Sequence, residues 1–319
     1  MYNFCRKYEY SCSAIRFRML YILIKFVTYI ALHLNKKKTT QHPSFQIPAS
    51  ILLIGKILQF FSKDAATQYV AKLFASPVKF EAPERELVMR QSAKTERLVL
   101  PKAQKEVQVY IYGYSRQKIL LVHGWAGRGT QLYQIADKIL ENKMMVVSFD
   151  APAHGLSEGK RTNMIEFIEA IRAVDKKYGP FHGAVGHSFG GMSLINAVSN
   201  GMKLNKLVTI GADNSIPEIF RYYVDKMELK PEIALRLQRL FEQKHKNKLD
   251  NFTSVNRAER IKIPVLVIHD SEDRYVDVSS AVEIRQNLRQ GELLITHGLG
   301  HHRIFKDPEV IERIIDYLQ

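Results

Sequence analysis

The stretch "AVGHSFGGMS", Ala184–Ser193, holds a serine with one glycine two residues before it and another two residues after it. The residues ahead of it, "HGAVG", are typical of a buried strand, and "GGMSLINAVSN" after it has helical spacing of apolar residues. A turn from strand to helix within so few residues favours glycine, because a Cβ would clash there. Gly186 and Gly190 are therefore predicted to flank a tight turn that presents the Ser188 hydroxyl at a helix N-terminus. The alternative is an ordinary glycine-rich loop whose serine has no role.

From about residue 85 onward, short apolar runs alternate with helical patterns on both sides of this stretch. The predicted strands are Arg97–Leu100, Val107–Tyr112, Lys118–His123, Met144–Phe149, Ala184–Gly186, Lys206–Ile210, Val265–His269 and Glu292–Thr296. The predicted helices among them include Thr130–Leu140, Met164–Lys177, Gly190–Ser199 and Ser279–Leu288. This alternation predicts an α/β fold with a mostly parallel sheet and helices on both faces. Because no helix separates the first two strands, that edge is predicted to be antiparallel.

A serine hydroxyl is a weak nucleophile unless a nearby base takes its proton. The stretch "THGLGHHRIF", after the last predicted strand, offers a histidine doublet. His301 follows Gly300 and has the better loop position, so it is the predicted base, and His302 is the alternative.

The base in turn needs a carboxylate that orients its ring. The stretch "VLVIHDSEDRYVD" places Asp273 on the loop that follows a predicted strand. Asp213, after the end of the preceding predicted strand, is the alternative acid. The order Ser188, Asp273, His301 is one recognised chain order of a catalytic triad.

An acyl-transfer serine also needs donors for the negative charge that develops on the substrate oxygen. In "KILLVHGWAGRGTQ" an apolar strand leads into a glycine-bearing loop that contains Trp125, the one tryptophan of the chain. The backbone N–H groups of Trp125 and Phe189, the residue after the serine, are the predicted oxyanion hole.

Five ordered motifs, "LLVHGW", "DAPAHGLS", "GHSFGG", "HDSEDRYV" and "GLGHHRIF", resemble those of α/β-hydrolase fold serine hydrolases, and most resemble bacterial esterase-like or lipase-like proteins with a "GLGHHRI" ending. The resemblance spans roughly residues 110–319. It implies a helical lid in the insertion at about residues 213–260, and a structural role near the site for Asp150 and His154.

Together these features predict a serine hydrolase that cleaves a carboxylic ester through an acyl-enzyme intermediate, with no cofactor and no metal. The expected substrate is a small-molecule ester or a lipid-like ester. Amide or thioester hydrolysis, or acyl transfer, would use the same residues. A non-catalytic binding protein of the same fold is the alternative from a different class.

The net charge of +15 belongs mostly to the N-terminal part of the chain. Residues 1–80 carry 12 Lys and Arg against two acidic residues, whereas residues 81–319 carry 35 against 30. This distribution argues against a nucleic-acid-binding face on the main body. Two parts are expected: a basic, apolar helical segment over residues 1–80, and an α/β-hydrolase domain with its lid over residues 81–319.

Phe17–Leu34 is 18 residues long and mostly apolar, with Lys36–Lys38 after it. A spanning helix needs roughly 20 apolar residues, so three alternatives stand: this helix packs on the protein, lies on a membrane through residues 17–38, or spans it. Further on, Ala49–Phe74 is expected to form one or two helices, with Ser62 as a cap. The only cysteines, Cys5 and Cys12, exclude a disulfide scaffold and favour a reducing, cytoplasmic location.

Overall fold

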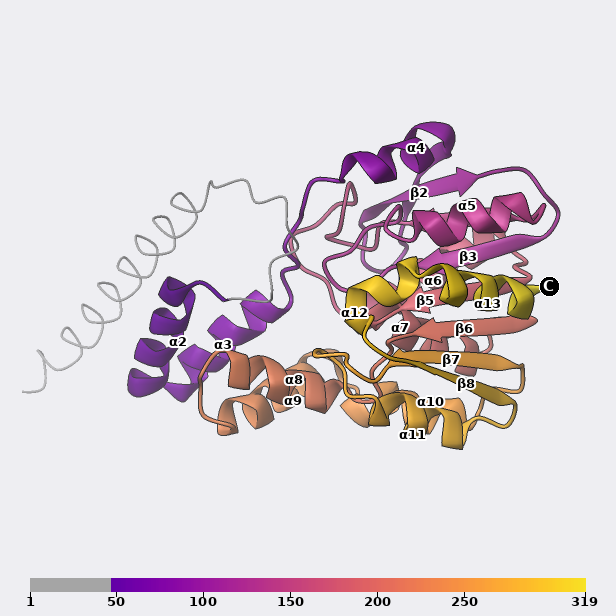
Figure 1. Cartoon of the computed structure of the whole chain (residues 1–319). Coiled ribbons are helices and arrows are strands. Elements are labelled where there is room, and N and C mark those ends of the chain that lie inside the picture. The colour runs from indigo at the N-terminus through magenta and orange to yellow at the C-terminus, as the bar shows by residue number, and fades with distance from the viewer. Residues whose placement is uncertain (1–46) are drawn as a thin grey trace, which may run out of the picture. The chain divides into compact units, whose positions relative to one another are not determined.

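The computed structural model describes residues 47–319 (Figure 1). The segment expected to meet a membrane, residues 17–38, lies outside this part of the chain. The described residues divide into two compact units. One is formed by residues 47–70 together with Phe220–Leu237, and the other by Ala71–Ile219 together with Gln238–Gln319.

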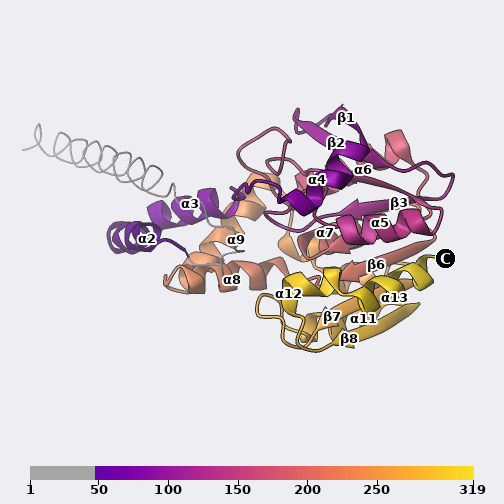
Figure 2. The same cartoon turned by 45° about the horizontal axis from the view of Figure 1, so that its top comes forward.

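The larger unit is built on one eight-stranded sheet. Its strands are β1 (Lys94–Val99), β2 (Glu106–Tyr112), β3 (Lys118–Val122), β4 (Met145–Phe149), β5 (Gly183–His187), β6 (Lys206–Ile210), β7 (Val265–Asp270) and β8 (Gly291–Thr296). Their order is β1-β2-β4-β3-β5-β6-β7-β8. The pairs β1–β2 and β2–β4 are antiparallel and all the others are parallel, which confirms the predicted sheet and its antiparallel edge. Strands β1 and β2 lie side by side at that edge (Figure 2).

Helices cover both faces of the sheet. They are α4 (Glu84–Ser92), α5 (Tyr133–Glu141), α6 (Met164–Tyr178), α7 (Phe189–Ser199), α10 (Ser254–Ala258), α11 (Ser279–Asn287), α12 (Gly300–Arg303) and α13 (Pro308–Leu318), with short 3₁₀ turns η1 (Leu249–Phe252) and η2 (Ile304–Lys306). Helices α5 and α13 pack together on one face, and α6 packs with α7 on the other (Figure 1). The four helices predicted between the strands are confirmed.

The core follows from the period of two along each strand. Ile119 and Leu121 of β3 lie in the core cluster that also contains residues of α5 and α13, whereas Leu120 and Val122 are buried outside that cluster. Because these strands are apolar on both sides, helices must cover both faces of the sheet. The loops that connect strands and helices therefore lie at the two ends of the strands. The loops that follow β5, β6 and β7 lie at the carboxyl end.

The smaller unit contains α2 (Ala49–Phe61) and most of α3 (Lys63–Phe74), together with parts of α8 (Ile216–Lys226) and α9 (Glu232–His245). Ser62 separates α2 from α3 and its hydroxyl accepts a hydrogen bond from the Ala65 N–H at 3.2 Å, which confirms the predicted cap. Within residues 47–319, no helix combines the length and the apolar character needed to cross a bilayer.

Contacts over a long sequence separation hold this smaller unit together. Gly55 of α2 lies against Leu229, and Lys63 forms an ion pair with Glu232 at 2.8 Å. The N-terminal helices therefore form one compact unit with part of the insertion, and the chain divides differently from the expected boundary at residue 80.

Candidate active site

Ser188 occupies the tight turn between β5 and α7. Its backbone φ is +53° and its ψ is −121°, a conformation that a residue with a Cβ adopts only under strain. Two glycines permit the turn. A Cβ on Gly186 would lie 2.8 Å from the carbonyl carbon of Gly190, and a Cβ on Gly190 would lie 2.4 Å from the carbonyl oxygen of Val122. Ser188 is thus held half-exposed in a strained turn, as predicted for a nucleophile.

The start of α7 and the loop after β3 lie on two sides of this serine. Phe189 is the first residue of α7, so its N–H has no partner within that helix and points with the positive end of the helix dipole. The loop after β3 approaches from the other side, because a Cβ on Gly124 would lie 3.0 Å from the Ser188 Cβ. Trp125 follows Gly124, and its ring meets the Phe189 ring edge to face at 5.3 Å between centroids. The two predicted oxyanion residues therefore flank Ser188.

The histidine and the carboxylate predicted for the triad are hydrogen-bonded to each other. The His301 Nδ1 lies 2.6 Å from the Asp273 Oδ2, and both side chains are buried. The second oxygen of Asp273 accepts hydrogen bonds from the N–H groups of Tyr275 and Val276 at 2.8 and 3.1 Å. The carboxylate is fixed by its own loop, and it fixes the imidazole in turn.

This pair lies next to the serine turn. The Ser188 N–H donates to the carbonyl of Ile210 at the end of β6. On the next residue, Gly211, a Cβ would lie 3.2 Å from the His301 Nδ1. Among residues 47–319, the hydrogen bonds of His301 do not include one to the Ser188 hydroxyl. Such bonds are often long in enzymes without substrate and shorten in the complex.

The electrostatics of the two candidate acids differ. Burial would raise the pKa of the Asp273 carboxyl, but the hydrogen bond and charge of His301 outweigh it and the pKa lies below its ordinary value. Burial raises the pKa of Asp213, although backbone N–H groups, including that of Ser215, partly offset it. The imidazole of His301 pairs with Asp273, and the Asp213 carboxylate accepts from Ser215 instead.

His302, the alternative base, is placed beside the pair. Its ring centroid lies 5.1 Å from that of His301 and 5.3 Å from that of Tyr275. Tyr275 also lies 5.3 Å from the His301 ring, so this tyrosine contacts both members of the doublet. The sequence analysis missed Tyr275. The one feature of the sequence that could have indicated its place at the site is its position two residues after Asp273.

A second residue that the sequence analysis missed is His187, directly before the nucleophile position. Its ring is buried, and the Nε2 lies 2.9 Å from the backbone carbonyl oxygen of His301, to which it donates. Burial, and then the neighbouring histidines His301 and His302, hold the pKa of His187 well below its ordinary value. A neutral His187 thus links the serine turn to the backbone of the predicted base.

The loop that carries His301 is tied to the end of β7 by Asp270. Its fully buried carboxylate accepts from the Thr296 hydroxyl at 2.7 Å and from the Leu299 N–H at 3.0 Å, while the other oxygen accepts from Glu272 N–H. Burial opposes ionisation, but these donors keep the pKa of Asp270 below its ordinary value.

Two buried histidines hold the loop that contains Trp125. His123 Nε2 accepts from the Ala151 N–H at 2.9 Å, so its Nδ1 carries the proton and donates to the Gly124 carbonyl at 2.7 Å. His154 Nε2 likewise accepts from the Ala126 N–H at 3.0 Å. Burial lowers the pKa of both rings, which keeps them neutral. These contacts agree with the structural role that the resemblance implied for His154.

Asp150 anchors the same region. One oxygen accepts from the Gly129 N–H at 2.6 Å, and the other accepts from the Tyr110 hydroxyl at 3.0 Å and the Leu156 N–H at 2.7 Å. None of these contacts involves Asp273 or His301, which again fits a structural role.

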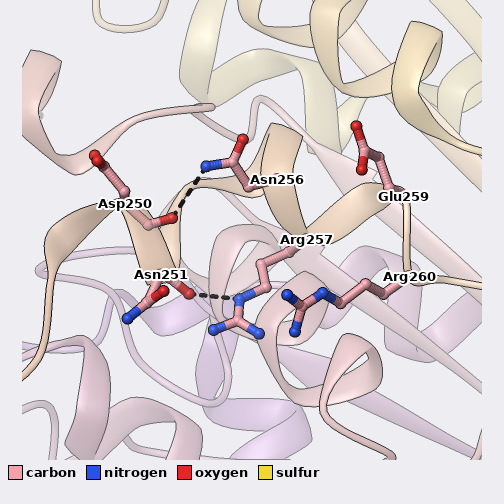
Figure 3. Close-up of a pocket in the computed structure, with 6 residues that line it drawn as sticks. All are labelled: Asp250, Asn251, Asn256, Arg257, Glu259 and Arg260. Carbon is pink, nitrogen blue, oxygen red and sulfur yellow. Dashed lines mark hydrogen bonds between the residues drawn. The ribbon is translucent and has the colours of Figure 1, made fainter.

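A shallow pocket of about 290 Å³ lies elsewhere, on η1, α10 and the residues after them (Figure 3). It is lined by Asp250, Asn251, Asn256, Arg257, Glu259 and Arg260. Arg257 Nε donates to the Asn251 carbonyl within the pocket, and Arg257 also donates to Asn200 Oδ1 at 3.1 Å. The pocket includes no residue of the predicted triad. Over the part of the chain that the structure describes, no three His, Cys, Asp or Glu side chains are grouped to hold a metal ion.

A strained serine turn after β5, an acid after β7 and a histidine after β8 define the α/β-hydrolase class of fold. The model of the alpha/beta hydrolase family matches residues 119–314, more than half of the chain, so the chain belongs to this family.

The curated relatives are distant. Alpha/beta hydrolase domain-containing protein 17C of Mus musculus is 25% identical over 178 residues, which cover 54% of this chain and 50% of the relative. The human protein of the same name is also 25% identical, with 49% of its length covered. The chain therefore spans about half the length of the curated relatives it matches.

Solved structures share the fold at low identity. An esterase from Pyrococcus furiosus has a TM-score of 0.59 and 17% identity, with 76% of this chain and 96% of the esterase covered. A bacterial membrane phospholipase A has a TM-score of 0.57 and 17% identity, with 83% and 97% covered. An esterase from Exiguobacterium antarcticum has a TM-score of 0.55 and 14% identity, with 70% and 99% covered.

Proposed function

We propose that this chain is a serine hydrolase that cleaves a carboxylic ester. The observation that carries the proposal is the 2.6 Å hydrogen bond between His301 Nδ1 and Asp273 Oδ2, next to a serine in a strained turn. With Nδ1 turned to the carboxylate, the Nε2 atom of His301 is the one that acts on the Ser188 hydroxyl.

In the proposed acylation, His301 Nε2 takes the proton of the Ser188 hydroxyl as the Oγ attacks the ester carbonyl carbon. The carbonyl oxygen becomes an oxyanion that accepts hydrogen bonds from the N–H groups of Trp125 and Phe189. Asp273 stabilises the imidazolium. His301 then gives its proton to the alkoxy oxygen, the C–O bond breaks, and the alcohol leaves an acyl group on Ser188.

Deacylation repeats these steps with water in the place of the serine. His301 takes one proton from the water, the remaining hydroxide attacks the acyl carbon, and the proton returns to the Ser188 oxygen as the acid leaves. The balance is one ester and one water to one acid and one alcohol. The same residues would cleave a thioester or an amide, or transfer the acyl group to another acceptor.

We further propose that the insertion at residues 213–260 acts as a lid that shapes the substrate site, because α/β-hydrolase enzymes select substrates largely through such segments. The insertion is helical, with α8, α9, η1 and α10. The expected substrate of the enzyme is a small or lipid-like ester. The expected location of the enzyme is the cytoplasm, in solution or at the cytoplasmic surface of a membrane.

A fluorophosphonate probe, which reacts only with an activated serine, tests this proposal. The wild-type protein should be labelled, and Ser188→Ala and His301→Ala should each lose labelling and lower ester turnover on the order of 10⁴-fold or more. His302→Ala is the matched control and should keep its labelling. A well-folded wild type that the probe does not label, or equal labelling of Ser188→Ala, would overturn the proposal.

A further inference from the structure

Helix α2 exposes a row of large apolar side chains. Leu53, Ile57, Phe60 and Phe61 are 59%, 40%, 84% and 70% exposed, and we call these four residues the α2 stripe. With 3.6 residues per turn, they fall within an arc of about 100° on the helix surface. Single exposed apolar residues are common in proteins, but a contiguous row that includes two phenylalanines indicates a contact surface.

The orientation of α2 is set by its other side. Ile54, Gly55 and Leu58 are buried, and a Cβ on Gly55 would lie 3.4 Å from Leu229 and 3.6 Å from Met227. On α3, Lys63 forms an ion pair with Glu232, and the Tyr69 hydroxyl donates to the Ile51 carbonyl at 3.4 Å. The Gly55 contacts and the Ile51 hydrogen bond hold α2 by one face, so the helix cannot turn the α2 stripe inward without losing them.

The two aromatic residues of the stripe contact each other. The Phe60 and Phe61 rings meet edge to face at 5.2 Å between centroids. Helix α2 has 13 residues, which corresponds to about 20 Å of helix axis, well short of the roughly 30 Å of a bilayer core. An apolar face on so short a helix suits a position along a surface, with the axis parallel to it.

The sequence that precedes α2 is basic, and this favours an anionic surface as the partner of the stripe. Residues 1–46, which lead directly into α2, contain eight Lys and Arg against one acidic residue, Glu9. Lys36–Lys38 lie eleven residues before Ala49, where α2 begins, so their reach from the helix is at most about 40 Å. Basic residues next to an apolar helical face are the combination that binds anionic lipid headgroups and the acyl boundary below them.

We propose that the α2 stripe is a docking surface for an anionic phospholipid membrane, with its apolar side chains at the acyl boundary. This function is separate from ester hydrolysis. It needs no covalent step, so a binding measurement can fail or succeed whether or not Ser188 is a nucleophile.

Sedimentation of the full-length chain with vesicles of equal parts phosphatidylcholine and phosphatidylglycerol tests the proposal. Wild type should bind these vesicles, bind less at high salt, and bind phosphatidylcholine vesicles weakly. Phe60→Ser/Phe61→Ser should weaken binding by at least about tenfold. Its matched control, Tyr114→Ser/Val88→Ser, removes two side chains of the other unit that are 102% and 63% exposed, and it should bind as wild type does. Both variants should melt at the wild-type temperature and hydrolyse a soluble ester at the wild-type rate.

A fluorophore at the stripe distinguishes the other occupants. With Cys5 and Cys12 changed to serine, an environment-sensitive dye on Phe60→Cys should shift to shorter wavelength only when vesicles are added, and a dye on Tyr114→Cys should not shift. A blue-shifted dye on a monomer without vesicles would mean that the protein's own segment 17–34 covers the stripe. A shift that follows protein concentration and a doubled mass would mean a second copy. Either result, or equal vesicle binding by wild type and Phe60→Ser/Phe61→Ser, overturns the proposal.

Discussion

The ends of the neighbouring strands β6 and β7 each carry a carboxylate near the candidate site, and they differ in what surrounds it. After β7, Asp273 accepts two backbone N–H bonds and pairs with His301, and its pKa lies below the ordinary value. After β6, Asp213 accepts from the Ser215 N–H at 3.1 Å, and burial raises its pKa. The donors that reach a carboxylate, and not its distance along the chain from the serine, decide which acid is ionised beside the histidine.

The end of β7 also carries a second hydrogen-bonded carboxylate, that of Asp270. Among the described residues, the loop after β6 has no second carboxylate of this kind. Asp270 ties β7 to the segment that carries His301 through the Thr296 hydroxyl and the Leu299 N–H. Charge-assisted bonds of this kind are roughly twice as strong as neutral ones. The end of β7 therefore holds both the predicted acid and the loop of the predicted base, and three variants test this difference between the two strand ends.

The largest effect is expected for Asp273→Asn. The amide can present an N–H toward His301 Nδ1, which favours the wrong tautomer and removes the charge that stabilises the imidazolium. We expect ester turnover to fall by about 10³–10⁴-fold, with the protein still folded by circular dichroism. A loss below about tenfold would show that the 2.6 Å bond does not contribute to catalysis and would shift attention to Asp213.

A smaller effect is expected for Asp270→Asn. The amide nitrogen must face one of the donors that the carboxylate now accepts, so at least one charge-assisted bond is lost, which corresponds to about 1.5–3 kcal/mol in the free energy of unfolding. Because the His301 loop is then less well placed, turnover should fall about tenfold. Urea denaturation and kcat measured on the same samples check both effects. Unchanged stability would mean that the Thr296 and Leu299 contacts are not needed to hold the loop.

The sequence predicts those parts of the fold whose signals are local. Strands such as β3, β4 and β7 are apolar runs that need no distant residue to be recognised, and the turn at Ser188 follows from two glycines at fixed spacing. The choice between Asp213 and Asp273 could not be made in this way. It depends on which loop meets His301, 28 residues away from Asp273, and that pairing is set by sheet order and by Asp270.

Contacts between distant segments were the least predictable. The ion pair between Lys63 and Glu232 joins segments 169 residues apart. The local sequence of neither segment indicates that the other is its partner. His187 was missed for a related reason. In the sequence, His187 has the pattern of a strand residue. Only the structure shows that its Nε2 donates to the backbone carbonyl of His301.

The smallest effect is expected for Asp213→Asn, which should keep ester turnover within about threefold of wild type because His301 does not pair with this carboxylate. The pH dependence of the thermal stability of this variant is more informative than its turnover. A carboxyl whose pKa is raised on folding destabilises the folded state as the pH rises from its unfolded pKa of about 4 through its folded pKa. A carboxyl whose pKa is lowered on folding stabilises the folded state above about pH 4, and this stabilisation is lost as the pH falls through its folded pKa. With rising pH, the melting temperature of Asp213→Asn should therefore gain on wild type, and that of Asp273→Asn should lose. The same direction for both variants in thermal melts across acid to neutral pH would contradict the contrast between the two strand ends.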